Sequence, residues 1–346
     1  MVIIGIDSHK RTHTFVAVDT LGRRLADKTL PATTKGHLEA LEWAERWPDK
    51  GWAIEDCRHL TRRLESDLLA GGEAVVRVPT RLMAAERRGE RERGKSDPID
   101  ALAVARAALR EPDLPVARLD GPARELKLLV DHREDLIRER VRMQARLRWH
   151  LHELFPGLVI RSRSLRHDGV FVELEARLDG VEGTVARIAR ELLVDIATLT
   201  KRSAELEREI TALVRTVAPS LLALPGCGPL SAAKIVGETA GVSRFKSRAA
   251  FARWNGTAPI PVWSGSTNFR LNRGGNRQVN AALHRIAITQ ARGIGVGRNY
   301  VDARTGRGDS KREALRMLRR RLSDEVFRRL LLDEVAPTVA EVTLAA

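Results

Sequence analysis

Short apolar runs separated by turn residues open the chain. Val2–Ile6 and His13–Asp19 are the first two runs, and a turn at Leu21–Arg23 leads into a third run at Leu25–Leu30. Runs of this length, rich in β-branched and apolar residues, are typical of strands. We therefore expect a three-stranded meander at the N-terminus.

Helical and strand patterns then alternate up to about residue 110. The predicted elements are a helix at Thr33–Trp47, a strand at Trp52–Glu55, a helix at Leu60–Leu69, a strand at Ala74–Val78 and a helix from Pro98 to Leu109. Proline suits the first turn of a helix because no hydrogen bond is lost there. A meander followed by strand–helix alternation is the element order of an RNase H-like fold. We predict such an α/β domain over residues 1–118.

Two long helices are predicted in the middle of the chain, over residues 119–218. Glu125–Leu154 carries one apolar stripe, and Ile188–Val217 carries apolar residues at alternating spacings of three and four, broken only by Ser203. The second pattern is close to a heptad repeat. It fits an antiparallel hairpin that packs within the chain as well as a dimerising coiled coil. Both interpretations remain open at the level of the sequence.

The last part of the chain, residues 219–346, predicts a mainly helical domain. Leu224–Pro229 leads into Ser231–Val236 and resembles a helix-hairpin-helix turn, in which glycines let the backbone come close to a phosphate. A helix is predicted at Gln278–Gln290, and Ser310–Leu332 predicts a basic amphipathic helix. The fold class expected for the whole chain is therefore α/β plus α.

The charge balance indicates a polyanionic partner. The chain has 60 Lys and Arg against 45 Asp and Glu, which gives a formal net charge of +15. A field of that sign attracts nucleic acid, the commonest polyanion in a cell. The candidate contacts to nucleic acid are Lys10, Gly226, Gly228, Arg270, Arg273, Asn276, Arg277, Lys311, Arg312, Arg316, Arg319 and Arg320.

Membrane and secreted classes are disfavoured by the same sequence. No apolar stretch is long enough to span a bilayer, and the N-terminal charges follow the apolar run, which is the reverse of a signal peptide. Cys57 and Cys227 form neither a metal-ligand pattern nor a disulfide framework. We interpret both as small buried side chains and expect a cytoplasmic protein.

Four carboxylates stand out by their positions. Asp7 and Glu55 end two predicted strands, and Asp97 and Asp100 lie three residues apart at the start of a helix. Strand ends and the neighbouring helix converge at one edge of such a sheet, where four carboxylates would repel one another without hard cations between them. Two Mg²⁺ ions about 4 Å apart could hold a scissile phosphate there. Taken singly, Asp7 could close a turn and Asp97 could cap its helix.

Two other residue groups near these patterns have weaker signals. His9 and His13 have a metal-ligand spacing that works on a helix but not on a strand, so we interpret them as surface or nucleic-acid contacts. Ser264 and Ser266 precede several arginines that could relieve charge during attack on phosphorus. Taken alone, this serine segment is better explained as a polar loop that touches phosphates than as a nucleophile.

The joint pattern resembles the DEDD transposases of insertion-sequence family 110, which are bridge-RNA-guided recombinases. The matching segments are VIIGIDSHK (2–10), Glu55, KSDPIDA (95–101), LPGCGPLSAAKIV (224–236), Phe245, Trp263–Gly265, Arg273–Asn276 and KREALRMLRRRL (311–322). These segments cover essentially the whole chain. Asp56-Cys57-Arg58 departs from the small residues and glycine that usually follow the family's glutamate.

The resemblance implies strand exchange on DNA by two cooperating domains. Asp7, Glu55, Asp97 and Asp100 would form the Mg²⁺ site of a RuvC-like domain, and Ser264, rather than Ser266, would be the nucleophile of the C-terminal transposase domain. It also implies a homo-oligomer, as dimer and tetramer, and a structured guide RNA that pairs with donor and target DNA.

Two other functions remain open from the sequence. A RuvC-like nuclease would use the same carboxylates with water as the nucleophile, and a non-catalytic scaffold would use only the basic surface. A tyrosine recombinase is disfavoured because Tyr300 is the one tyrosine and no matching Arg and His set accompanies it.

Overall fold

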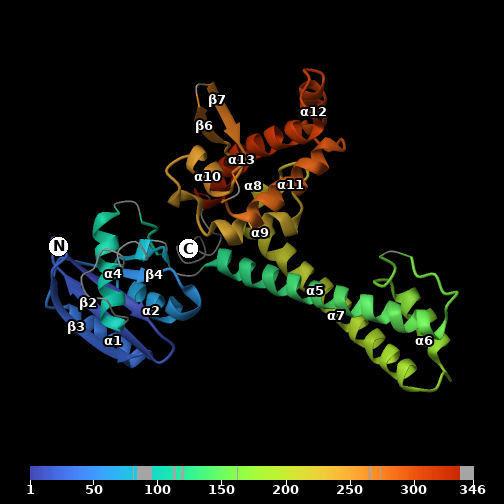
Figure 1. The fold of residues 1–346 in the computed structure, drawn as a ribbon, viewed down its shortest axis with the longest axis horizontal. Coiled ribbons are helices and arrows are strands. Elements are labelled where there is room, and N and C mark those ends of the chain that lie inside the picture. The colour runs from blue at the N-terminus through green and yellow to red at the C-terminus, as the bar shows by residue number, and fades with distance from the viewer. Residues whose placement is uncertain are drawn as a thin grey trace, which may run out of the picture. The chain divides into compact units, whose positions relative to one another are not determined.

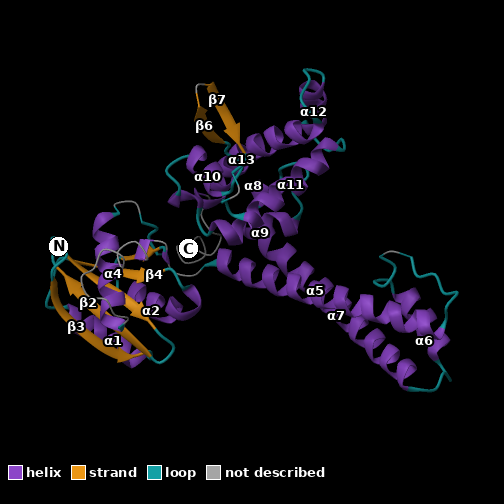
Figure 2. Ribbon diagram, viewed as in Figure 1, coloured by secondary structure: helices purple, strands orange, loops and turns teal. Residues whose placement is uncertain are grey.

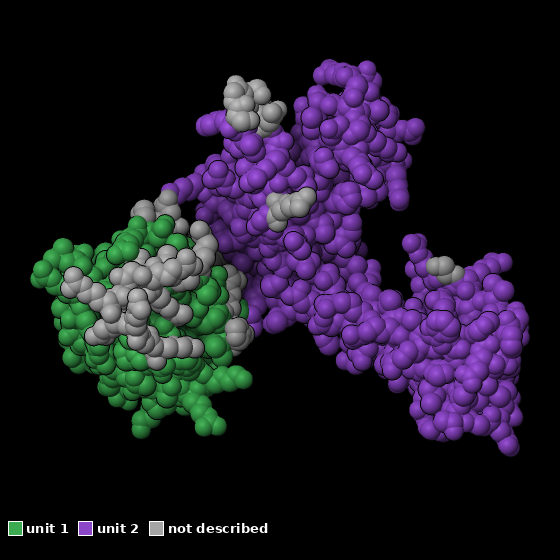
Figure 3. Space-filling model, viewed as in Figure 1, with its two compact units in different colours: residues 1–120 green, residues 121–346 purple. Residues whose placement is uncertain are grey.

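The computed structural model describes residues 1–80, 82–83, 96–111, 114–117, 121–161, 163–264, 266–272 and 274–335. The chain divides into two compact units, residues 1–120 and 121–346, which Figure 3 shows in green and purple. Among the described residues no helix is both long and apolar enough to cross a membrane.

A five-stranded mixed sheet forms the centre of unit 1 (Figure 2). Its strands are β1 (Val2–Ser8), β2 (Thr12–Val18), β3 (Arg24–Pro31), β4 (Lys50–Glu55) and β5 (Val75–Val78), in the order β3-β2-β1-β4-β5. The first three strands are antiparallel to one another, whereas β1, β4 and β5 run parallel. The predicted meander and the mixed α/β character of this part are confirmed.

Helices cover both faces of the sheet. Helices α1 (Thr34–Ala44) and α2 (Arg58–Ala70) pack on one face, over a core that includes Phe15 and Trp52. Helix α4 (Asp97–Arg110) packs on the other face and contributes alanines and Val104 to a second core. Small residues on α4 let its backbone lie close to the strands, and this close approach places the start of the helix at the edge of the sheet.

Unit 2 begins with a helical hairpin. Helices α5 (Pro122–Leu154) and α7 (Thr184–Val217) lie side by side, and α6 (Asp168–Leu178) packs at their far end (Figure 1). Ile196 and Ile210, which belong to the apolar repeat of α7, are fully buried within this chain. The repeat therefore packs against α5, as the hairpin interpretation predicted. The predicted homo-oligomer stays a prediction.

The remaining helices gather around the base of that hairpin. They are α8 (Pro219–Leu222), α9 (Pro229–Thr239), a 3-10 turn η1 (Val242–Arg244), α10 (Arg248–Trp254), α11 (Arg277–Ala291), α12 (Gly297–Thr305) and α13 (Lys311–Val335). Strands β6 (Ile260–Ser264) and β7 (Ser266–Arg270) form a separate antiparallel hairpin. Leu126 of α5 and Val214 of α7 share one apolar core with Phe251 and the C-terminal helices. The predicted division at residue 219 stays a prediction.

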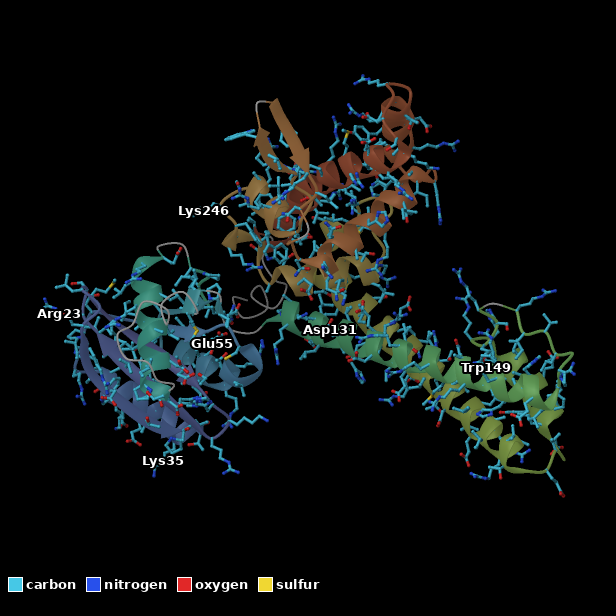
Figure 4. All side chains as sticks on the ribbon, viewed as in Figure 1. Arg23, Lys35, Glu55, Asp131, Trp149 and Lys246 are labelled. Carbon is cyan, nitrogen blue, oxygen red and sulfur yellow. The ribbon has the colours of Figure 1, made fainter. Side chains whose placement is uncertain are left out.

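Buried charges tie the hairpin base to α9. Lys234 is 2% exposed, and its Nζ lies 3.0 Å from Asp131 Oδ1 and 2.9 Å from Glu134 Oε2 of α5. Lys127 pairs with Asp131 at 2.9 Å and also with Glu238. Each carboxylate of this network has a lysine partner, and the buried charge of Lys234 is compensated by two carboxylates. Figure 4 labels Asp131 near the base of the hairpin.

Candidate metal centre and nucleic-acid interface

Asp7 and Glu55 lie side by side at one edge of the sheet in unit 1. The strands β1 and β4 are parallel, and Ile6 pairs with Ile54, so the next residues along, Asp7 and Glu55, occupy equivalent positions. Side chains alternate between the faces of a strand. Both carboxylates therefore point to the face that α4 covers. Glu55 is labelled in Figure 4.

Helix α4 brings the other two carboxylates to the same edge. Asp97 and Asp100 lie in its first turn, where the helix dipole favours negative charge. Gly5 of β1 allows this approach: a Cβ on Gly5 would lie 2.2 Å from the backbone oxygen of Ala101. Real Cβ atoms do not come that close to backbone oxygens. A glycine at this strand position is therefore needed for the helix to reach the site.

Asp7 is the most buried of the four carboxylates. Asp7 is 4% exposed, and burial raises the pKa of its carboxyl above the ordinary value. His9 acts in the opposite direction, whereas Asp100, Asp97 and Glu55 each add to the rise in pKa. Asp7 Oδ2 is buried and has no hydrogen-bond partner among the described residues. A buried acceptor with three carboxylates around it is a position suited to a cation.

His9 belongs to this cluster, contrary to its interpretation from the sequence. Its Nε2 lies 3.1 Å from Asp7 Oδ2 and 3.2 Å from Asp97 Oδ1. A turn closed by the hydrogen bond from His9 N to Thr12 O folds the histidine back over the strand end. One ligand atom each from Asp7, His9 and Asp97 lies within 4.8 Å of the others. The set of oxygen and nitrogen donors fits a divalent metal ion.

His13 and Cys57 have other surroundings. His13 is buried on the opposite face of the sheet, where it stacks on His37, and burial together with His37 and His9 lowers its pKa to about 4. It is a neutral core residue, not a surface contact. Cys57 follows Glu55 at the rim of the site, and burial, with Glu55 and Asp7, raises its pKa to about 11. The thiol is protonated at neutral pH and is a poor metal ligand.

The predicted nucleophile lies in unit 2, on the β6–β7 hairpin. Ser264 and Ser266 are backbone partners at its tip, and Gly265 between them is outside the described residues. The neighbouring Trp263 is 77% exposed, as expected for a hairpin that projects into solvent. Arg270 is exposed at the other end of β7, opposite Ile260. Arg273 lies outside the described residues.

The predicted glycine turn and Asn276 are both used in packing. Gly226 has φ +81, and a Cβ there would press on Ile286 and Thr289 of α11, so the turn faces that helix. Gly228 precedes the first residue of α9. Asn276 caps α11 by accepting from Val279 N at 2.9 Å, and its Nδ2 donates to Glu238 at 2.8 Å. The Asn276 amide is therefore engaged within the chain.

The other predicted contacts are spread over two regions. Lys10 is exposed in the turn between β1 and β2 of unit 1. In unit 2, Lys311, Arg312 and Arg316 are exposed at the start of α13. Arg320 pairs with Asp324, whereas Arg319 and Arg277 line one pocket. The predicted basic contacts of unit 2 therefore include exposed residues at the start of α13 and two arginines that line a pocket.

Comparison with known proteins gives the same identification for both ends of the chain. Residues 4–156 match a family model described as "Transposase", and residues 218–302 match one described as "Transposase IS116/IS110/IS902 family". The 44.8 kDa protein of insertion element IS116 from Streptomyces clavuligerus is 28% identical, over 94% of this chain and 93% of its own. The 42 kDa protein of insertion element IS900 from Mycobacterium paratuberculosis is 24% identical, over 99% and 98%.

A solved structure of RuvC from Thermus thermophilus shows a more limited likeness. The two sequences are 18% identical, and the match covers 31% of this chain and 92% of the RuvC chain, with a TM-score of 0.26.

Proposed function

Because this chain belongs to the IS116/IS110/IS902 family of transposases, we propose that it cuts and rejoins DNA with a carboxylate-bound divalent metal and a serine nucleophile. The observation that carries the metal part is the buried Asp7 Oδ2, which accepts no hydrogen bond from the described residues, has His9 Nε2 3.1 Å away and has Asp97, Asp100 and Glu55 around it. The basic group beside Asp7 is the imidazole of His9, whereas Lys127 and Lys234 pair with the carboxylates of unit 2.

We propose that the metal is Mg²⁺, bound as two ions. The residues proposed to hold it are Asp7, Glu55, Asp97 and Asp100. A bound divalent ion would offset the carboxylate charges and polarise the phosphate to be cut. His9, 3.1 Å from Asp7, adds a nitrogen donor to the same position. The burial of Asp7 keeps bulk water away from one side of the site, which strengthens electrostatic interactions there.

Ser264 is proposed to attack the phosphate. Its Oγ would form a bond to phosphorus while a DNA oxygen leaves as a hydroxyl, and the serine proton would pass to a base. The number of phosphoester bonds stays constant, so a hydroxyl of another DNA end can later displace the serine. The position of Ser264 beside the tip of the β6–β7 hairpin and the family's C-terminal model, which spans residues 218–302, support this assignment.

A structured guide RNA is the proposed source of target choice. The net charge of +15 and the exposed cations of α13 would hold RNA and DNA backbones without reading bases. Sequence recognition would then come from base pairing. We propose that the active assembly is a homo-oligomer that combines the two units of different subunits.

Covalent trapping tests the serine step directly. With guide RNA, Mg²⁺ and both DNA partners, the wild type should yield a protein–DNA adduct that survives denaturation. Ser264→Ala should lose the adduct and recombination but keep nucleic-acid binding, since it removes one hydroxyl. Ser266→Ala is the matched control and should retain activity. Cleavage without any adduct, unchanged in both variants, would instead establish a nuclease that uses water.

A further inference from the structure

A pocket of about 410 Å³ opens in unit 2 beside the base of the β6–β7 hairpin. Its walls include Leu271 and Asn272, the two residues that directly follow β7. Two arginines and a histidine line it, and no aspartate or glutamate of the described chain does. A concave site with cations and no carboxylate attracts anions.

One face of α11 supplies most of the polar wall. Arg277, Asn280 and His284 are spaced by three and four residues, so they form a single stripe along the first two turns of the helix. Arg277 is the first residue of this helix. The N-terminal end of a helix carries partial positive charge and free N–H groups, which adds to the attraction for an anion.

Two glycines form part of the pocket wall. Gly275 lies on the turn at Gly256, and a Cβ on Gly275 would be 2.2 Å from Gly256 N. Gly256 has φ +74, a conformation that residues with a side chain rarely adopt. Both glycines line the pocket, so the wall they form has no side chains. The space remains available because this contact is between two backbones.

Arg319 of α13 closes the opposite side. Its Nη1 donates to Asn280 Oδ1 at 2.8 Å, and Asn280 Nδ2 in turn donates to Asn255 O at 2.9 Å. These bonds fix the orientation of the guanidinium group. Arg319 Nε is buried and has no acceptor among the described residues. An arginine held in place with an unused donor is suited to an acceptor that comes from outside the chain.

The ionisation of the lining residues agrees with this reading of the geometry. Burial and the nearby Arg316 lower the pKa of Arg319, and burial and Arg319 lower the pKa of His284. The positive charge of the pocket therefore comes from Arg277 and Arg319, and Arg319 is further opposed by the nearby Arg316. A bound anion would relieve this repulsion.

We propose that this pocket binds a backbone phosphate of the DNA on which the hairpin acts. The proposal rests on the proposed function and adds a specific phosphate seat to it. Arginine forks recognise phosphate oxygens in pairs, and Arg277 and Arg319 face the same space. Ser264 and Ser266 lie at the hairpin tip. Ser266 is four residues before Arg270 at the base of the hairpin, which is ~13 Å of strand. The pocket thus holds a phosphate that flanks the one to be cut.

Binding to a short DNA duplex without metal tests the pocket. The full-length protein is titrated against a fluorescein-labelled duplex in EDTA over a series of NaCl concentrations. Each phosphate contact contributes about 0.9 to the slope of log K against log salt. Arg277→Gln and Arg319→Gln should each lower that slope by about 1 and weaken binding about tenfold at low salt.

Arg285→Gln is the matched control. It removes the same charge from the same helix, but Arg285 is exposed and does not line the pocket. This variant should bind within about twofold of the wild type with an unchanged slope. If the pocket variants bind as Arg285→Gln does, the proposal is wrong. Because Arg277 is exposed and makes no bond that the fold needs, Arg277→Gln decides the result if Arg319→Gln fails to fold.

Two further measurements separate the alternatives. Inorganic phosphate, compared with chloride at equal ionic strength, should compete weakly with the duplex; strong competition at millimolar phosphate would assign the pocket to a free anion. Cleavage is then assayed separately with Mg²⁺. Loss of binding in the pocket variants, with no cleavage even by the wild type, would support the pocket and refute the proposed function. Normal binding by both pocket variants, together with cleavage by the wild type, would refute the pocket and leave the proposed function supported.

Discussion

Carboxylates are gathered in both units, but with different partners. In unit 1, Asp7 has three carboxylates around it and one histidine, whose Nε2 is 3.1 Å away. In unit 2, Asp131 lies between Lys127 and Lys234, at 2.9 Å and 3.0 Å. In the second cluster, lysines lie at hydrogen-bond distance from each of the three carboxylates Asp131, Glu134 and Glu238, whereas the basic group beside Asp7 is a histidine. Carboxylates paired with lysines stabilise the fold, whereas carboxylates gathered around one another are suited to binding a cation.

The pKa values of the two aspartates express this contrast. Burial acts to raise the pKa of both carboxyls. For Asp131, hydrogen bonds from Lys127 and Lys234 outweigh burial, and the pKa falls below its ordinary value. For Asp7, His9 does not outweigh burial, and the neighbouring carboxylates add to the rise. Ionisation of Asp131 therefore favours folding, and ionisation of Asp7 opposes it.

The largest expected effect is on metal-dependent chemistry. Asp100→Asn removes a carboxylate from the site but keeps its size, and it should lower Mg²⁺-dependent strand cleavage by at least ~10²-fold, because several kcal/mol of charge stabilisation depend on the ion. Asp131→Asn is the comparison, and its folded fraction should cleave normally. Cleavage of wild-type rate by Asp100→Asn would show that the cluster in unit 1 is not the metal site. Cleavage is measured on end-labelled DNA.

The next effect is on folding of unit 2. Lys234→Ala leaves Asp131 and Glu134 without their buried partner, which costs about 3–5 kcal/mol. The melting temperature should fall by about 10 °C. Lys311→Ala, which removes an exposed lysine from α13, should leave it unchanged. Equal melting temperatures in calorimetry for the two variants would mean that the network contributes nothing to stability.

A smaller effect of opposite sign is expected at Asp7. Its pKa is raised on folding, so its contribution to stability is present below the unfolded value near 3.8 and is lost as the pH rises through the folded value. At neutral pH without metal, Asp7→Asn should therefore raise the melting temperature by a few degrees. Added Mg²⁺ should stabilise the wild type and not the variant. A variant that melts lower than the wild type in EDTA would contradict the repulsion described here.

The smallest effect is expected at Asn276. Asn276→Ala removes the cap of α11 and the bond to Glu238, and it should destabilise unit 2 by about 0.5–2 kcal/mol. Because the amide is engaged within the chain, the salt slope of DNA binding should not change. Asn276→Ser keeps a capping oxygen and should recover part of the stability. A reduced salt slope in either variant would support the sequence-based prediction of Asn276 as a nucleic-acid contact.

The proximity of two carboxylates could be predicted because neighbouring parallel strands end at the same edge of a sheet. Asp7 and Glu55 follow from that rule alone. His9 could not be found in this way, since its position depends on a turn that folds back over the strand end. The role of Asn276 depends on Glu238, 38 residues away. An apolar repeat like that of α7 looks the same whether its partner is α5 or another chain, so only the structure identified α5.

Gly5 gives the acidic site a weak point that lies outside its ligands. A single methyl group there would collide with the backbone of α4 and push Asp97 and Asp100 away from Asp7. Under the proposed function, a copy of the gene with a substitution at Gly5 would lose activity although the four proposed metal ligands and Ser264 were intact. A survey of those five residues alone would therefore overstate the number of active copies.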